Sequence, residues 1–121
     1  MIAALHHVQI TIPKGCEAEA RAFYCAELGL PEIPKPAALL ARGGFWLELG
    51  NIQIHVGTED GVARRSTKAH LGFAVDDLAG ARRLIERLGL EVSDGEPIPG
   101  LARFEFRDPF GNRVEFVQRI A

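Results

Sequence analysis

The chain has 121 residues, of which 47% are hydrophobic and 25% are charged, and its formal net charge at pH 7 is −2. This composition is typical of a globular protein with a hydrophobic core and excludes a disordered chain. The nearly balanced charge gives no reason to expect nucleic acid or an anionic membrane as a partner. No apolar run reaches the roughly 18 residues of a membrane-spanning helix, so no membrane insertion is expected.

The N-terminal region predicts a strand over residues 6–12, because polar and apolar side chains alternate in the sequence HHVQITI. The apolar side chains share one face, which should pack on a helix, and His7 lies on the opposite face. His6 points to the same side as the apolar residues. The segment lacks the basic flank and small-residue cleavage site of a signal peptide.

The next segment predicts a helix that ends at Gly29. Small and apolar residues recur in it at helical spacing, and they are Ala18, Ala22, Cys25, Ala26 and Leu28. Cys16 and Cys25 lie about half a turn out of phase on this helix, so they cannot form a disulfide. Two unpaired cysteines without an export signal predict a reducing, cytoplasmic location.

The rest of the first half follows a Pro-rich passage, and the predicted strands are about 38–42, 45–49 and 52–56. The segment 57–69 is polar and has no periodicity, which predicts a linker or a mobile flap. Its basic residues could bind an anionic substrate or could simply keep the loop soluble, and the sequence leaves both open; they are Arg64, Arg65 and Lys68.

The second half repeats the first. Leu28-Gly29-Leu30 recurs as Leu88-Gly89-Leu90, an offset of 60 residues, and each copy closes a predicted helix. Asp77 is placed to cap the second helix, and Gly89 suits its C-terminal end. The predicted strands of this half are about 70–75, 90–93, 102–107 and 113–118, and the turn DPFGN (108–112) joins the last two.

The predicted fold is therefore α+β, with two tandem βαβββ modules of residues about 5–57 and 69–119 and a linker of about 58–68. Neither module is large enough to form a stable fold alone. We expect a single domain over residues 1–121, in which a curved sheet surrounds a central cleft and the helices lie outside.

Four side chains with metal-binding chemistry fall at repeated positions. His55 and Glu115 are related by the offset of 60 residues, and His7 and His70 by a similar offset of 63. Strand alternation places all four on the face that does not pack on the helices. Imidazole and carboxylate groups bind Zn, Ni, Mn or Fe(II), so the pattern predicts a divalent metal site.

Each of these residues also has an ordinary structural explanation. A single histidine in a strand is more often a structural or surface group than a ligand, and Glu115 alone could be a solvent-facing carboxylate. The metal hypothesis rests on the coincidence of the repeat with the predicted facing of the side chains. His6 faces the other side and is not predicted to be a ligand.

The chain resembles the vicinal oxygen chelate superfamily, which includes glyoxalases, bleomycin-resistance proteins and extradiol dioxygenases. The resemblance covers nearly the whole chain, and its motifs are LHHVQITIP, RAFYCAELGLP, AHLGFAVDDL and DPFGNRVEFVQ. It implies paired βαβββ modules, often in a homodimer, and metal ligands at His7, His55, His70 and Glu115. Glyoxalase I usually has Glu at the position of His55 and an epimerase has Gln, so the resemblance does not identify the substrate.

The leading functional hypothesis is a metal-dependent, glyoxalase-like lyase or isomerase that acts on a small molecule. A divalent cation that binds two neighbouring substrate oxygens stabilises an enediolate or a similar anion. Proton transfer then needs a base, for which Glu115 is the first candidate and a metal-bound water the second. Whether the four ligands meet within one chain or across a dimer is left open.

Three alternatives come from other classes of the same superfamily. A dioxygenase would use His7, His70 and Glu115, but it would need a further acid or base, and Tyr24 is expected in the core. A thiol transferase would need a basic pocket, for which Arg103 and Arg107 are candidates, although solvated surface positions are the simpler interpretation. A metal-free drug-binding protein would use the aromatic residues 45–46, which are also typical core residues.

Overall fold

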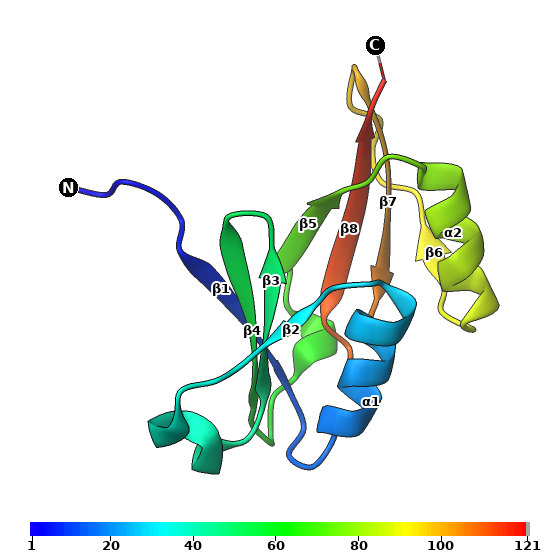
Figure 1. The fold of residues 1–121 in the computed structure, drawn as a ribbon. Helices are drawn as coiled ribbons and strands as arrows, with labels where there is room; N and C mark the ends of the chain where they lie inside the picture. The colour runs from blue at the N-terminus through cyan, green and yellow to red at the C-terminus, as the bar shows by residue number, and fades with distance from the viewer. Residues whose placement is uncertain (121) are drawn as a thin grey trace. The chain divides into compact units, whose positions relative to one another are not determined.

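The computed structural model describes residues 1–120 and contains two compact units (Figure 1). The first comprises Met1–Val62 and the second begins at Ala63, so the boundary lies inside the predicted linker. Each unit contains a four-stranded sheet with the chain order βαβββ, which confirms the predicted α+β class and the duplicated module. The arrangement of both units around a central cleft stays a prediction.

The sheet of the first unit has the order β1-β4-β3-β2. Its strands are β1 (His7–Ile12), β2 (Glu32–Ile33), β3 (Phe45–Leu49) and β4 (Ile52–Thr58). β1 runs parallel to β4, and the other pairs are antiparallel. Alternation gives the sheet one fully buried apolar face, whose residues are Ile12, Phe45, Leu47, Ile54 and Val56.

The first helix buries a different stripe from the predicted one. α1 (Glu17–Arg21) continues as a π-helical stretch over Ala22–Glu27, and the buried residues are Ala20, Phe23 and Tyr24. The predicted stripe is wrong, because its alanines are exposed. The aromatic pair removes far more apolar area from water than the alanines would, and the wider π turn alters the spacing.

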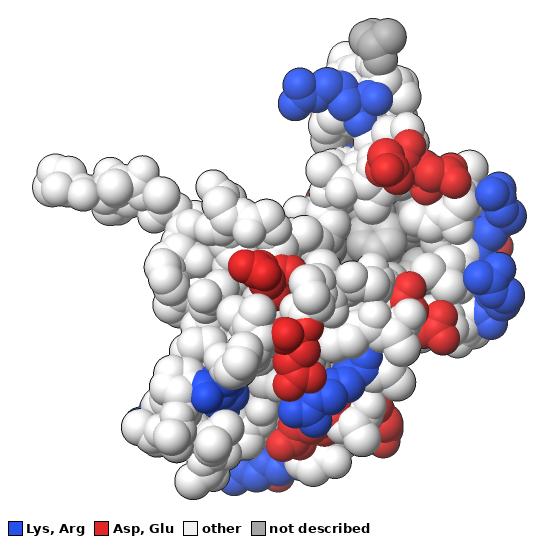
Figure 2. Space-filling model, in the orientation of Figure 1, with Lys and Arg blue, Asp and Glu red and all other residues white. Residues whose placement is uncertain are grey.

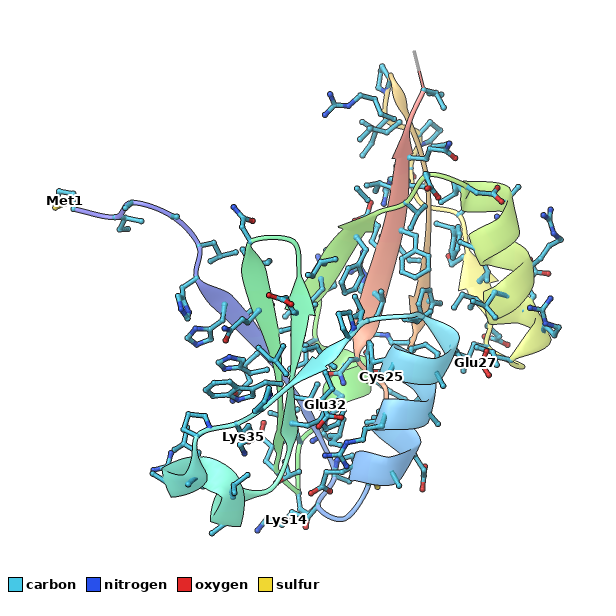
Figure 3. The ribbon with its side chains drawn as sticks, in the orientation of Figure 1. Met1, Lys14, Cys25, Glu27, Glu32 and Lys35 are labelled. Carbon is cyan, nitrogen blue, oxygen red and sulfur yellow. The ribbon has the colours of Figure 1, made fainter. Side chains whose placement is uncertain are left out.

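Arg21 links this helix to its sheet. Its Nε donates to Glu32 Oε1 over 2.8 Å, and its guanidinium carbon lies 4.7 Å from the ring centre of Phe45. Figure 3 marks Glu32 on the strand and Cys25 on the helix. Both cysteines of the chain are free, as predicted from their spacing.

The predicted strand at 38–42 is wrong. Residues Ala37–Arg42 form a 3₁₀ helix that follows Pro36, and the second strand instead comes from Glu32–Ile33 in the Pro-rich passage. Alanine and leucine favour helical conformations, and a preceding proline is well suited to a helix start. The edge strand needs only two residues to pair with β3.

The sheet of the second unit has the equivalent order, β5-β8-β7-β6. Its elements are β5 (His70–Ala74), α2 (Leu78–Arg87), β6 (Val92–Ser93), β7 (Leu101–Arg107) and β8 (Arg113–Arg119). Asp77 caps α2 by accepting from Gly80 N over 3.0 Å, as predicted. The core between helix and sheet consists of Ile85, Phe104, Phe106, Val114 and Phe116.

The turn between β7 and β8 is organised by a buried carboxylate. Asp108 is 0% exposed and accepts hydrogen bonds from the backbone N–H groups of Phe110 and Asn112. These bonds satisfy the charge of the carboxylate and hold the predicted turn in place.

The linker is held to the second unit by Arg107. Its guanidinium donates to the backbone carbonyls of Arg64 and Thr67 in the linker and of Gly111 in the turn. The linker also contains a short 3₁₀ helix, Arg64–Ser66, in which Arg64 is buried. Residues 64–67 of the predicted linker are therefore fixed to the second unit.

Acidic and basic side chains alternate on the surface seen in Figure 2, without a large area of one sign. Basic groups border the outer side of α2, and acidic groups lie close to them. Within residues 1–120, no helix has the length and the apolar composition to cross a membrane.

Gly44 tests the packing of the first sheet. Its φ is +80°, and a Cβ atom there would collide with the carbonyl oxygen of Val56. We expect Gly44→Ala to lower the free energy of unfolding by about 2–4 kcal/mol, measured by urea unfolding. Gly50→Ala is the matched control, because Gly50 has φ +57° with no atom near the added methyl, and it should cost only about 1 kcal/mol. Equal losses in both variants would contradict the packing argument.

Candidate functional site

The two units place their candidate ligands in the same register. In the β1–β4 pair, His7 lies opposite the residue two positions before His55. In the β5–β8 pair, His70 lies opposite the residue two positions before Glu115. Each unit therefore brings its two candidate ligands together as diagonal neighbours on one sheet face.

The pair in the second unit is directly hydrogen-bonded. His70 Nε2 lies 3.1 Å from Glu115 Oε2, and the two side chains are 31% and 15% exposed. His70 Nδ1 lies 2.8 Å from the backbone carbonyl of Lys68, which can only accept, so Nδ1 carries a hydrogen. A backbone carbonyl in this role fixes the ring so that Nε2 is the nitrogen available to a metal.

The spacing of this pair suits two ligands of one ion. Metal–nitrogen and metal–oxygen bonds of about 2.0–2.2 Å place two neighbouring ligand atoms about 3 Å apart when they meet at a right angle. The observed distance of 3.1 Å between the nitrogen and the oxygen agrees with this requirement.

Glu115 has a second partner that the sequence interpretation missed. Arg103 Nη1 donates to Glu115 Oε1 over 2.9 Å, and the Arg103 side chain is only 14% exposed. The hydrogen bond that Arg103 donates to Glu115 raises the pKa of Arg103 above its usual value, so the guanidinium remains charged. The assignment of Arg103 to a solvated surface is therefore wrong.

The charge pattern of strand β7 could have revealed this partner. Arg103, Glu105 and Arg107 alternate in sign on the same sheet face as Glu115. A run of charges on one face of a strand beside a candidate ligand predicts ion pairs across the sheet.

The pair in the first unit is arranged differently. His55 lies in a column of three nearly parallel rings, with its centre 3.9 Å from that of Trp46 and 4.2 Å from that of His7. These rings leave His55 only 7% exposed. Burial lowers the pKa of His55 below its ordinary value, and the neighbouring charges of His7, His6 and Lys35 lower it further. The imidazole is therefore neutral at neutral pH, as a ligand must be.

The stacking keeps His7 and His55 from sharing a metal in this arrangement. A histidine binds a metal along the lone pair in its ring plane. The two ring planes are inclined by only 15°, so their lone pairs do not converge. His55 Nε2 also lies 2.9 Å from Gln53 Oε1, to which it donates. Joint ligation requires one of the rings, such as the exposed His7, to rotate out of the column.

The described part of the chain, residues 1–120, contains no group of three or more His, Cys, Asp or Glu side chains that could hold a metal. The structure brings together His7 with His55 and, separately, His70 with Glu115. The predicted four-ligand centre stays a prediction.

A cavity lies beside the ring column. In the first unit, a space of about 340 Å³ is lined by His55 and Trp46 together with the basic residues Lys35 and Arg42. Figure 3 marks Lys35 on the segment that follows β2. The volume falls in the range of small-molecule pockets.

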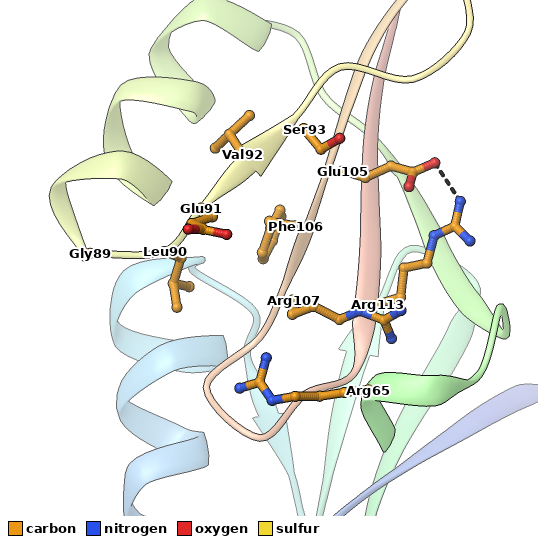
Figure 4. A pocket seen from close by; sticks show the side chains of 10 residues that line it. All are labelled: Arg65, Gly89, Leu90, Glu91, Val92, Ser93, Glu105, Phe106, Arg107 and Arg113. Atoms are coloured by element: carbon orange, nitrogen blue, oxygen red, sulfur yellow. Dashed lines mark hydrogen bonds and ion pairs between the residues drawn. The ribbon is translucent and has the colours of Figure 1, made fainter. Parts of the chain in front are cut away.

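A larger cavity of about 550 Å³ lies in the second unit (Figure 4). It is lined by three arginines from different segments, which are Arg65, Arg107 and Arg113. Arg107 is bonded to backbone carbonyls, and Arg113 is paired with Glu105, as the dashed line in Figure 4 shows. Neither His70 nor Glu115 lines this cavity.

Solved structures similar to this chain share its fold. A Bacillus anthracis protein assigned to the glyoxalase family is 42% identical, with a TM-score of 0.88 and coverage of 99% of this chain and 98% of that one. The fosfomycin resistance protein FosX from Listeria monocytogenes, complexed with Mn(II) and sulfate, is 18% identical, with a TM-score of 0.80 and coverage of 99% and 93%. TnmS3, an antibiotic binding protein from Streptomyces sp. CB03234, is also 18% identical, with a TM-score of 0.72 and coverage of 99% and 100%.

The search of curated proteins finds no match to this chain. The sequence model of the Glyoxalase/Bleomycin resistance protein/Dioxygenase superfamily matches residues 4–116. The match covers both βαβββ units, including all four candidate ligands, and agrees with the duplicated fold. The chain belongs to the Glyoxalase/Bleomycin resistance protein/Dioxygenase superfamily.

Proposed function

We propose that this protein is a divalent-metal-dependent, glyoxalase-like lyase or isomerase that acts on a small substrate with neighbouring oxygen atoms. Its metal ligands are His7, His55, His70 and Glu115, contributed within one chain or across a homodimer. The observation that carries the proposal is the His70–Glu115 pair, whose 3.1 Å spacing and ring orientation suit a metal. The Mn(II) in the complex of FosX supports a divalent cation for this fold.

Each residue has a distinct part in this proposal. When bound, a divalent cation would polarise the substrate oxygens and stabilise the negative charge that develops on them. The neutral ring of His55 and the ring of His70 supply nitrogen ligands, and the backbone carbonyl of Lys68 keeps the His70 ring oriented. Glu115 supplies an oxygen ligand and is also the candidate for moving a proton to or from the substrate carbon.

The contacts favour this chemistry over two related alternatives. A dioxygenase would need an additional acid or base, and Tyr24 is 1% exposed in the core. A thiol transferase would need free basic groups, but Arg103 is bonded to carboxylates and Arg107 to backbone carbonyls.

A second candidate function is the binding of a planar drug-like molecule without catalysis. Trp46, Lys35 and Arg42 line the cavity of the first unit, and an aromatic wall with basic groups suits an aromatic, anionic ligand. This function requires the ring column to remain closed, whereas the metal function requires it to open. Metal binding therefore separates the two candidates.

We further propose a homodimer in a reducing compartment. The two free cysteines agree with such a compartment.

The first test uses Trp46, which is the one tryptophan in the sequence and stacks on His55. Ni²⁺ or Co²⁺ added to the metal-free protein should quench its emission, because a paramagnetic ion at His55 lies beside the indole.

Elemental analysis should find about one ion per chain in the wild type, since four ligands form one site. His55→Ala should lose most of the metal.

Glu19→Ala is the control, because Glu19 is an exposed carboxylate on α1 and is not a proposed ligand. It should retain the metal. Full retention of the metal in His55→Ala would remove His55 from the ligand set, and no binding by the wild type would favour the drug-binding candidate.

The neutrality of His55 gives a second test. Because its pKa in the folded protein is lowered from about 6.5, the unfolded chain binds the proton more strongly. The stabilising contribution is thus complete above that pH and is lost as the pH falls below it. In metal-free urea unfolding, the wild type should lose stability relative to His55→Gln between about pH 7.5 and pH 5.5. A difference that does not change with pH would show that His55 is not buried in its neutral form.

A further inference from the structure

Five side chains form a continuous chain of polar contacts across one face of the second sheet. They run in the order His70, Glu115, Arg103, Glu105 and Arg113. The successive nitrogen–oxygen distances are 3.1, 2.9, 3.1 and 2.6 Å. The two guanidinium groups carry two positive charges and the two carboxylates carry two negative charges. These four groups are therefore neutral together, and His70 lies at the end of the chain beside Glu115.

Arg103 lies at the centre of this chain and is fixed from several sides. Its Nη1 donates to both Glu105 and Glu115, and its Nε donates to the backbone carbonyl of Glu96 over 3.3 Å. The segment before β7 approaches the guanidinium so closely that a Cβ atom on Gly95 would collide with it. Arg113 holds Glu105 in turn, so the central guanidinium has little freedom to turn away.

These contacts give the two carboxylate oxygens of Glu115 different partners. Oε1 accepts from Arg103, and Oε2 faces His70. A carboxylate that is free to rotate could offer either oxygen, or both, to a cation. With Oε1 held by a charged donor, Oε2 remains as the oxygen directed toward the position between Glu115 and His70.

We propose that Arg103 is a positioning residue that holds Glu115 through Oε1, so that Oε2 alone faces His70 and serves as the metal ligand. The inference rests on the proposed metal function. An outer partner of this kind orients a ligand before the ion arrives, and its loss weakens metal binding even though it does not touch the metal. Gly95 contributes to the same positioning of Arg103, because the absence of a side chain at Gly95 leaves room for the guanidinium.

The test compares metal affinities by calorimetric titration of the metal-free protein with Mn²⁺ and with Zn²⁺. Arg103→Met should weaken binding about 10- to 100-fold, and Arg103→Lys, which retains a positive donor, should lie between this variant and the wild type. Arg119→Met is the matched control, because Arg119 lies at the exposed end of β8, and it should bind as the wild type does. Unchanged or stronger binding by Arg103→Met would overturn the proposal.

Gly95→Ala provides a route to the same effect that keeps the arginine. The added methyl group should displace the guanidinium and weaken metal binding in the same direction. Its effect should largely vanish when it is combined with Arg103→Met, because both changes act through one contact. If the losses of metal affinity add in the double variant, Gly95 does not act through the position of Arg103.

A metal-free measurement separates this inference from the proposed function. The ¹⁵N resonances of the His70 ring report its contact with Glu115 at Nε2 and with Lys68 at Nδ1. Arg103→Met should shift the Nε2 resonance, whereas Arg119→Met should not. If the wild type binds no metal, the proposed function fails, and the NMR comparison then decides the role of Arg103 alone. An unchanged His70 spectrum in Arg103→Met would overturn that role.

Discussion

The parallel pairing of the opening and closing strands in each unit determines which polar side chains can meet. Parallel register sets His7 diagonal to His55 and His70 diagonal to Glu115. The opposite face of each sheet is committed to the core, so a shift of one residue would bury these polar groups and expose the apolar ones. The hydrophobic core thus fixes the register, and the register fixes the candidate site.

The two pairs differ in how they satisfy their polar groups. Glu115 is held by a hydrogen bond from Arg103, and His70 by the backbone of the linker. His55 instead lies between two rings, where burial disfavours its charged form. The two side chains of the second pair point their ligand atoms at each other, whereas the rings of the first pair lie stacked face to face.

The sequence predicted the features that depend on local pattern and repetition. The Asp77 cap and the strand at 45–49 follow from capping chemistry and alternation, and the repeated order of elements follows from the internal offset. The 3₁₀ helix at residues 37–42 was missed, because its apolar residues suit either a strand or a helix and tertiary context decides. The contact of Arg103 with Glu115 was missed because each charge was judged by itself, although the alternating signs along β7 and the turn that joins it to β8 favour ion pairs across the hairpin.

We propose that the two equivalent pairs supply one metal site. Anomalous diffraction from crystals of the full chain grown with Zn²⁺ tests it most directly, because it locates the ion and its ligands together. We expect one ion bound by His7, His55, His70 and Glu115, with the His7–His55 stack opened and Arg103 still bonded to Glu115. An ion held by one pair alone, with the ring column intact, would contradict it.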